Sequence, residues 1–148
     1  MKVKKSKPVK IIFIFLFAAY VLLLIYLTFF SSYFGRGTVY RNINLIPFKT
    51  ILQYLVRDRD IRNMLINIAG NIAVFMPMGF LLPIVFKPFN RFGSIFAAIF
   101  SATFLIEAAQ YFFAAGSSDI DDILLNLMGG FIGLFIYKAM YLYRYKKI

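Results

Sequence analysis

The chain contains no cysteine and no histidine among its 148 residues, and only six acidic residues. Without cysteine there is no disulfide framework, no thiolate metal site and no cysteine nucleophile. Without histidine the commonest zinc ligand and the commonest general base at neutral pH are missing. These absences exclude a Ser-His-Asp hydrolase, a histidine-dependent lipid phosphatase and an HExxH protease. Any chemistry has to come from carboxylates, amides, basic side chains or backbone groups.

Apolar sequence is what the chain has in excess. Hydrophobic residues make up 61% of it and the mean hydropathy is +0.77, whereas about half of the residues are apolar in an ordinary soluble domain. The long apolar runs leave room for about four spans of ~20 residues, which predicts an all-α integral membrane protein. The net charge of +11 is then explained by Lys and Arg at the span ends and by anionic lipid headgroups. No segment has the polar surface that nucleic-acid binding needs.

Four transmembrane helices are predicted, at about 11–34, 64–86, 93–115 and 122–143, as a bundle in a single domain over residues 1–148. The first apolar run is longer than the ~7–15-residue core of a secretory signal peptide, and no small-residue cleavage site closes it. Between the first two spans, the KTILQYLV segment after Pro47 predicts a short amphipathic or re-entrant helix at the membrane interface.

The distribution of basic residues predicts the orientation of the spans. With the amino terminus inside, the cytoplasmic segments hold eleven of the 17 Lys and Arg residues, and the outer segments hold six, all in the first loop. Cytoplasmic loops of membrane proteins carry the excess of basic residues. We therefore expect a multi-pass protein of the cell membrane with both termini in the cytoplasm.

Polar residues gather toward the outer ends of the last three spans. Glu107 is the only acidic residue within a span, and a carboxylate in lipid costs a few kcal/mol unless it is partnered or protonated, which favours a functional role. Glu107 and Asn71 both lie roughly 10–12 Å below the outer ends of their spans. We therefore expect these two residues in contact, below Asp122 and Asn126. The candidate binding residues are Asn44, Asn67, Asn71, Glu107, Gln110, Asp119, Asp121, Asp122 and Asn126.

Structural roles are open for several of these residues. Asn67 and Asn71 are equally consistent with interhelical hydrogen bonds. Asp119 is more readily explained as the cap of the fourth helix. Gly129 and Gly133 form a GxxxG pattern, for which close helix packing is the favoured explanation.

Three motifs in order resemble the VanZ-like family. They are NLIPF at 44–48, NIAGNIAVFMPMGFLLP at 67–83, and E-x-x-Q-x8-D-x-D-D-x3-N at 107–126, followed by two glycines. The resemblance covers about residues 11–143. It implies a small bacterial membrane protein, typical of Gram-positive cells, whose namesake is associated with low-level resistance to teicoplanin, a lipid-tailed glycopeptide. Carried over by position, the motif residues with structural roles are Pro47, Phe48, Phe75, Pro77, Gly79 and Gly129.

The leading hypothesis is a non-enzymatic or not-yet-assigned envelope protein with an acidic and amide pocket in the outer leaflet. The pocket would bind a membrane lipid headgroup, a lipid-linked cell-wall precursor or the lipoglycopeptide itself, and so reduce the action of the drug. A further hypothesis treats the chain as a subunit of a homo- or hetero-oligomer that associates through the GxxxG pattern and the polar face.

The alternative is an intramembrane enzyme that acts on a lipid-linked envelope substrate. Its candidate catalytic residues are Glu107, Asp121 and Asp122, with Glu107 as a general acid or base. No cofactor is identified, but a divalent cation, Mg²⁺ or Ca²⁺, could be held by the oxygen ligands of Asp119, Asp121 and Asp122. A phosphate of the substrate would pair with Arg57, Arg59 or Arg62.

Overall fold

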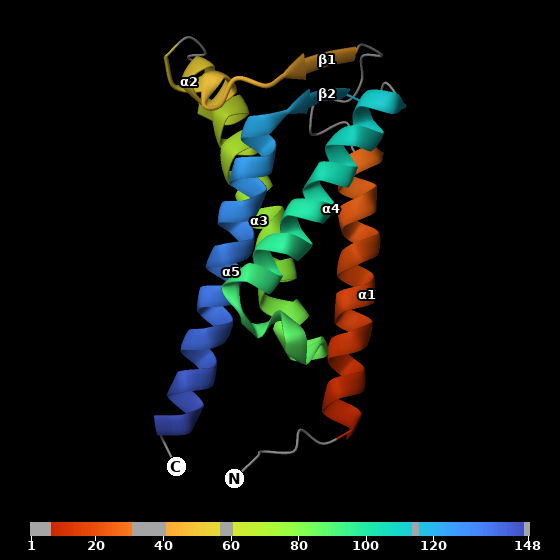
Figure 1. Cartoon of the computed structure of the whole chain (residues 1–148), viewed down its shortest axis with the longest axis vertical. Helices are drawn as coiled ribbons and strands as arrows, with labels where there is room; N and C mark the ends of the chain where they lie inside the picture. The colour runs from red at the N-terminus through yellow and green to blue at the C-terminus, as the bar shows by residue number, and fades with distance from the viewer. Residues whose placement is uncertain (1–6, 31–40, 57–60, 114–115, 147–148) are drawn as a thin grey trace.

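In the computed structural model, four long helices run side by side along the molecule and a small layer of short elements covers one end (Figure 1). The structure describes residues 7–30, 41–56, 61–113 and 116–146. Within these residues the elements are α1 Lys7–Phe29, β1 Arg41–Asn44, α2 Lys49–Val56, α3 Ile61–Val85, the 3-10 helix η2 Lys87–Asn90, α4 Phe92–Phe112, β2 Gly116–Asp119 and α5 Ile120–Lys146.

The four long helices are each apolar and long enough to cross a membrane, over Pro8–Phe29, Met64–Val85, Phe92–Phe112 and Ile120–Tyr141. The predicted helical membrane fold is confirmed, and so is the short helix after Pro47, which is α2. Residues 31–34 and 114–115, at the ends of two predicted spans, lie outside the described residues. α1 begins and α5 ends at the same end of the molecule, which we call the basal end (Figure 1).

α3 and α5 are the most closely packed pair of helices, and glycines allow their backbones to meet. A Cβ atom on Gly79 would lie 1.8 Å from the carbonyl oxygen of Gly130, and one on Gly133 would lie 2.0 Å from the carbonyl oxygen of Met76. A Cβ atom on Gly129 would likewise lie 2.1 Å from the carbonyl oxygen of Ile72 in α3. Small residues at such spacing let membrane helices approach closely. The GxxxG surface of α5 is therefore occupied by α3 of the same chain.

α1 joins this pair through a mixed polar and apolar contact. Tyr20 and Leu24 of α1 belong to the buried core, together with Phe75 of α3. The Tyr20 hydroxyl donates a hydrogen bond to the backbone carbonyl of Val74 at 2.9 Å, close to Pro77, which lies inside α3. Proline removes a backbone donor from a helix, and in lipid every backbone group needs a partner from the protein. The tyrosine thus fastens α1 to the part of α3 that contains Pro77.

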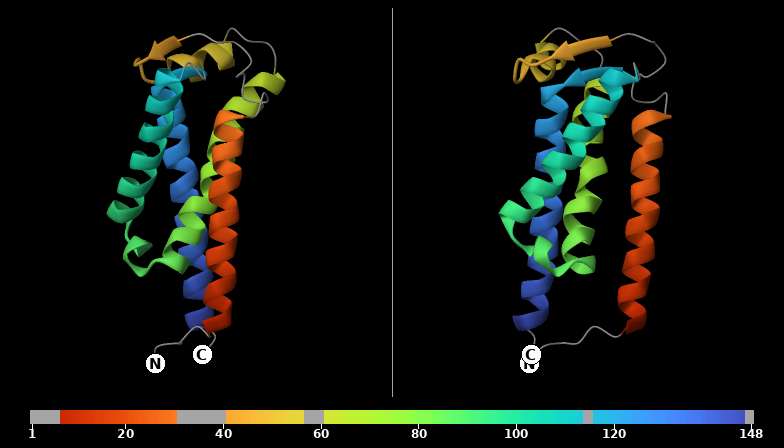
Figure 2. Two further views of the ribbon diagram at one scale, coloured as in Figure 1. Left: turned by 90° about the vertical axis from the view of Figure 1, so that its right-hand side faces the viewer. Right: turned by 45° about the vertical axis from the view of Figure 1, so that its right-hand side comes forward.

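A cap, formed by residues 41–56 and 116–119, covers the end opposite the basal end (Figure 2). It contains β1 and β2, which pair in parallel with Arg41 opposite Gly116 and Asn44 opposite Asp119. α2 lies beside the strands (Figure 1). The sequence predicted neither strand, because the GSSDIDD segment at 116–122 is typical of a short acidic turn. In the structure, residues 116–119 are instead extended and hydrogen-bonded to β1.

Candidate functional site

Asp121 fastens the cap to the fourth membrane-spanning helix. It is completely buried in the first turn of α5. Its carboxylate accepts hydrogen bonds from the backbone N–H groups of Phe48, Thr50 and Ile51, at 2.5, 2.8 and 3.1 Å. These N–H groups open α2 and have no partner within the helix, so a negative charge is favourable there. A side chain of α5 therefore caps the amino terminus of α2.

The chain turns sharply before α2 to make this contact. Phe48 has a φ angle of 64°, in the left-handed region that residues other than glycine seldom adopt. Its side chain is exposed, so burial of the ring does not offset the energetic cost of this backbone conformation. The hydrogen bond from its N–H to Asp121 stabilises the turn instead.

Asp119 connects the two strands of the cap to the start of α5. Its Oδ1 accepts hydrogen bonds from Asn44 Nδ2 and from the backbone N–H of Asp121, both at 2.9 Å. The hydroxyl of Thr50 donates to the other carboxylate oxygen of Asp119 and accepts from Asn44 at 3.0 Å. Asp119 therefore acts as the side-chain cap of α5 and also holds the beginning of α2.

Glu107 meets the underside of the cap from α4. It is 6% exposed, and one carboxylate oxygen accepts the backbone N–H of Asp119 at 2.9 Å. The Ser118 hydroxyl donates to the backbone carbonyl of Glu107 at 2.6 Å. Because both contacts involve β2, the strand and the end of α4 are held as one unit. The carboxylate is placed at the boundary between the cap and the bundle.

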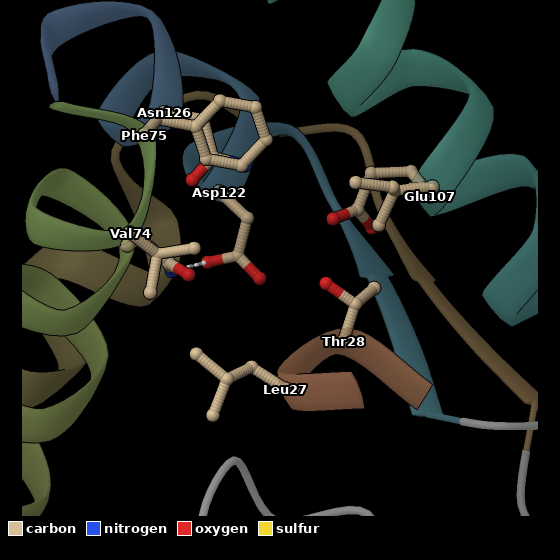
Figure 3. Close-up of a pocket in the computed structure, with 9 residues that line it drawn as sticks. Leu27, Thr28, Val74, Phe75, Glu107, Asp122 and Asn126 are labelled. Atoms are coloured by element: carbon tan, nitrogen blue, oxygen red, sulfur yellow. Dashed lines mark hydrogen bonds between the residues drawn. The ribbon is translucent and has the colours of Figure 1, made fainter. Parts of the chain in front are cut away.

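A small cavity of about 20 Å³ lies under the cap, between α1, α3, α4 and α5. It has room for about one water molecule. Figure 3 shows the carboxylates of Glu107 and Asp122 and the hydroxyl of Thr28 directed toward a shared space. Asn71 also lines the cavity and donates a hydrogen bond from Nδ2 to Asp122 at 2.6 Å.

Asn126 gives this cavity a buried acceptor. Its side chain is 4% exposed, and Nδ2 donates to the Thr103 hydroxyl at 2.7 Å. Asn126 lines the cavity, whereas Thr103 does not. Its Oδ1 is buried without a hydrogen-bond partner among the described residues.

Comparison with known proteins identifies the chain. The profile of the VanZ/LLP1 family matches residues 17–142, and Protein VanZ of Enterococcus faecium is 33% identical over 126 residues, 82% of this chain and 71% of that protein. The chain belongs to the VanZ family. The resemblance noted in the sequence motifs is thereby confirmed. No solved structure matches the chain significantly.

All the candidate residues of this VanZ-family chain lie within the matched region, but the structure divides them into groups. Those that line the cavity are Asn71, Glu107, Asp122 and Asn126, and those that hold the cap are Asn44, Asp119 and Asp121. Gln110 is buried beside them and donates from Nε2 to the backbone carbonyl of Thr28 at 3.4 Å. Asn67 is half-buried on α3 and does not line the cavity.

The three aspartates of the DxDD pattern are directed to different partners. Asp119 and Asp121 bind groups of the cap, and Asp122 faces the cavity. In the part of the chain that the structure describes, no group of three acidic residues could share a metal ion. Of the candidate phosphate-binding arginines, Arg57 and Arg59 lie outside the described residues, and Arg62 is exposed at the start of α3.

Three threonines of the site were missed by sequence reasoning. Thr103 precedes Glu107 by one turn on the same buried face of α4, so its i, i+4 spacing could have revealed it. Thr28 and Thr50 gave no such signal, because their partners belong to other elements. A threonine near the end of an apolar run is common, and only the folded chain shows what it contacts.

Proposed function

We propose that this VanZ-family protein lowers the susceptibility of the bacterial cell to lipoglycopeptides such as teicoplanin. It would act in the outer leaflet by binding a lipid headgroup, a lipid-linked cell-wall precursor or the drug itself. One observation carries the proposal: polar side chains of Thr28, Asn71, Glu107, Asp122 and Asn126 converge from four helices on one cavity beneath the cap. Polar groups in membrane helices are costly and usually mark functional sites.

The proposal places the capped end outside the cell and both termini in the cytoplasm. Basic residues support this orientation, because Lys87 and Arg91 are exposed in the turn between α3 and α4, and Lys138 lies 3.9 Å from the ring centroid of Phe92 near the same end. A glycopeptide with a lipid tail acts at the outer leaflet, where the tail inserts. The cavity would lie on that side.

The contacts of the aspartates favour binding over catalysis. Asp121, one of the candidate catalytic residues, is committed to three backbone N–H groups of the cap. Asp119 is committed to Asn44 and Thr50. A carboxylate that holds backbone groups in the folded chain is not positioned to transfer protons to a substrate. We therefore propose a non-enzymatic role for the site.

Susceptibility of cells that express single-residue variants tests the proposed function. Glu107→Gln and Asp122→Asn keep the side-chain shapes but remove the charges of the cavity. With equal amounts of protein in the membrane, we expect both variants to lose most of the teicoplanin resistance that the wild type confers. Ser101→Ala on the exposed face of α4 is the control and should retain it. Unchanged resistance in both cavity variants would refute the cavity as the cause of resistance. Susceptibility to vancomycin, measured in parallel, reports whether the effect depends on the lipid tail of the drug.

A further inference from the structure

We infer that the groove between α1, α3 and α5 is a binding site for an anionic phospholipid of the leaflet at the basal end. The acyl chains of the lipid lie in the groove, and its phosphate lies beside Lys10. This site is separate from the cavity under the cap, so the inference does not depend on the proposed function. Three properties carry it: the apolar lining of the groove, its size, and the charge of the basal end.

The groove is a hollow, apolar part of the membrane-spanning surface. Leu16 of α1, Phe80 of α3 and Met140 of α5 line it, and none of its eight described lining residues is polar or charged. Figure 1 and the right-hand view of Figure 2 show α1 and α5 on opposite sides of α3. Gly133 of α5, which also lines the groove, has no side chain to fill it. Only an apolar group is suited to such a lining.

The size of the groove favours acyl chains over a helix. Its volume is about 440 Å³, and along α5 it extends from Gly133 to Met140, a rise of roughly 10 Å. A helix with its side chains is about 10–12 Å across and would need about twice this volume over the same length. Flexible acyl chains adapt to a narrow and irregular groove. We therefore assign the groove to lipid rather than to a helix of a second copy or of another protein.

The charge of the basal end selects the kind of lipid. Apolar contacts alone give little preference, because the tails of all phospholipids are as apolar as the groove. Residues 7–10 of α1, 87–91 between α3 and α4, and 138–146 of α5 contain seven Lys or Arg residues and no Asp or Glu. A basic residue near the membrane surface favours anionic lipid about five-fold. The headgroup of the bound lipid is therefore expected to be anionic.

Lys10 is the basic residue that we assign to the phosphate. It is exposed on α1, six residues nearer the basal end than Leu16 of the groove, which is about 9 Å along the helix. A lysine lays its stem along apolar surface and keeps its charge at the level of the headgroups. Lys138 of α5 differs, because its ammonium lies 3.9 Å from the ring centroid of Phe92 in α4 and it does not line the groove. Lys138 is therefore a matched control for loss of charge.

Single tryptophans report which lipid lies beside them, since the chain has none of its own. Phe80→Trp places the reporter in the groove, and Phe96→Trp places it on the exposed face of α4. Both positions lie about 6–8 Å from the basal end of their helix. The full-length variants are purified and reconstituted into vesicles of phosphatidylcholine with a fixed fraction of phosphatidylglycerol. Bromine on the acyl chains of one lipid or the other quenches the fluorescence.

The two quenching measurements, made at the same overall lipid composition, give the relative affinity for the two lipids at each position. We expect Phe80→Trp to show a preference for phosphatidylglycerol about five-fold above that of Phe96→Trp, the effect of one basic side chain near the phosphate. An equal preference would show only a general attraction to the basal end and would overturn the inference. Weak quenching of Phe80→Trp by both lipids would also overturn it, because a protein helix would then cover the groove.

Charge variants test the position of the phosphate. In the Phe80→Trp background, Lys10→Gln should remove most of the five-fold preference, whereas Lys138→Gln should retain it. A preference unchanged in Lys10→Gln would overturn the assignment of the phosphate to Lys10. If Phe80→Trp does not fold, Met140→Trp is the reporter in the groove, and Tyr141→Trp, at an exposed position that does not line the groove, is its control.

Discussion

Asp119, Asp121 and Asp122 lie within four positions of one another but have three different roles. Asp119 caps α5 and holds β1, Asp121 caps α2, and Asp122 bonds to Asn71 at the cavity. Residues that follow one another at the start of a helix point about 100° apart, so neighbouring carboxylates diverge. This geometry directs the three carboxylates of the DxDD pattern to different partners. The sequence predicts acidic residues at a helix start, but not the partner that each one finds.

Asp121→Ala should destabilise the cap more than any other single change in it. Three backbone N–H groups would lose a charged acceptor, and leaving buried donors unsatisfied costs about 2–3 kcal/mol. Amide hydrogen exchange of α2 and the Tm of the purified protein measure the loss. Gln53→Ala, on an exposed position of α2, is the control. Protection of α2 that is equal in Asp121→Ala and wild type would show that the cap is held by other contacts.

At the scale of elements, the membrane spans could be predicted and the cap strands could not. Each span is a long apolar run, and its hydropathy alone determines its type. β1 and β2 have four residues each, and Asn44 pairs with Asp119 across 75 positions. Short polar strands have no alternating pattern to reveal them. They pair only because α4 and α5 bring residues 116–119 to the capped end, which depends on the assembled bundle.

The α3–α5 contact predicts how glycine substitutions will behave. Gly133→Ala and Gly79→Ala would each place a methyl group about 2 Å from a backbone carbonyl oxygen, and such overpacking costs about 1–3 kcal/mol. Gly93→Ala is a matched control, because nothing lies within 4 Å of its added Cβ. Since Gly93 is near the start of α4, alanine there should be neutral or stabilise by up to about 1 kcal/mol. Chemical unfolding in detergent measures all three, and equal stabilities would contradict the close approach of the helices.

At the scale of the whole molecule, the interior of the helix bundle is polar under the cap and apolar toward the basal end. The cavity with Glu107 and Asp122 lies under the cap. A groove lined almost entirely by apolar side chains, including Leu16, Phe80 and Met140, lies between α1, α3 and α5 on the basal side. Equal depths along α3 and α4 were enough to predict from the sequence that Asn71 and Glu107 lie near the same end, where both line the cavity. A direct contact between the two side chains stays a prediction. The separation of cap residues from cavity residues was not predictable, because it depends on where residues 41–56 lie over the bundle.

This polarity makes the orientation in the membrane the property on which the proposed function depends. The chain has no cysteine, so single cysteines introduced at the exposed residues Gln53, in α2, and Asn90, in η2, report the two ends separately. A membrane-impermeant maleimide should label Gln53→Cys in intact cells and Asn90→Cys only after permeabilisation, because the basic turn at 87–91 is expected in the cytoplasm. The cysteine-free wild type controls for background labelling. The opposite pattern would place the cavity on the cytoplasmic side, where it could not meet a drug or a precursor in the outer leaflet.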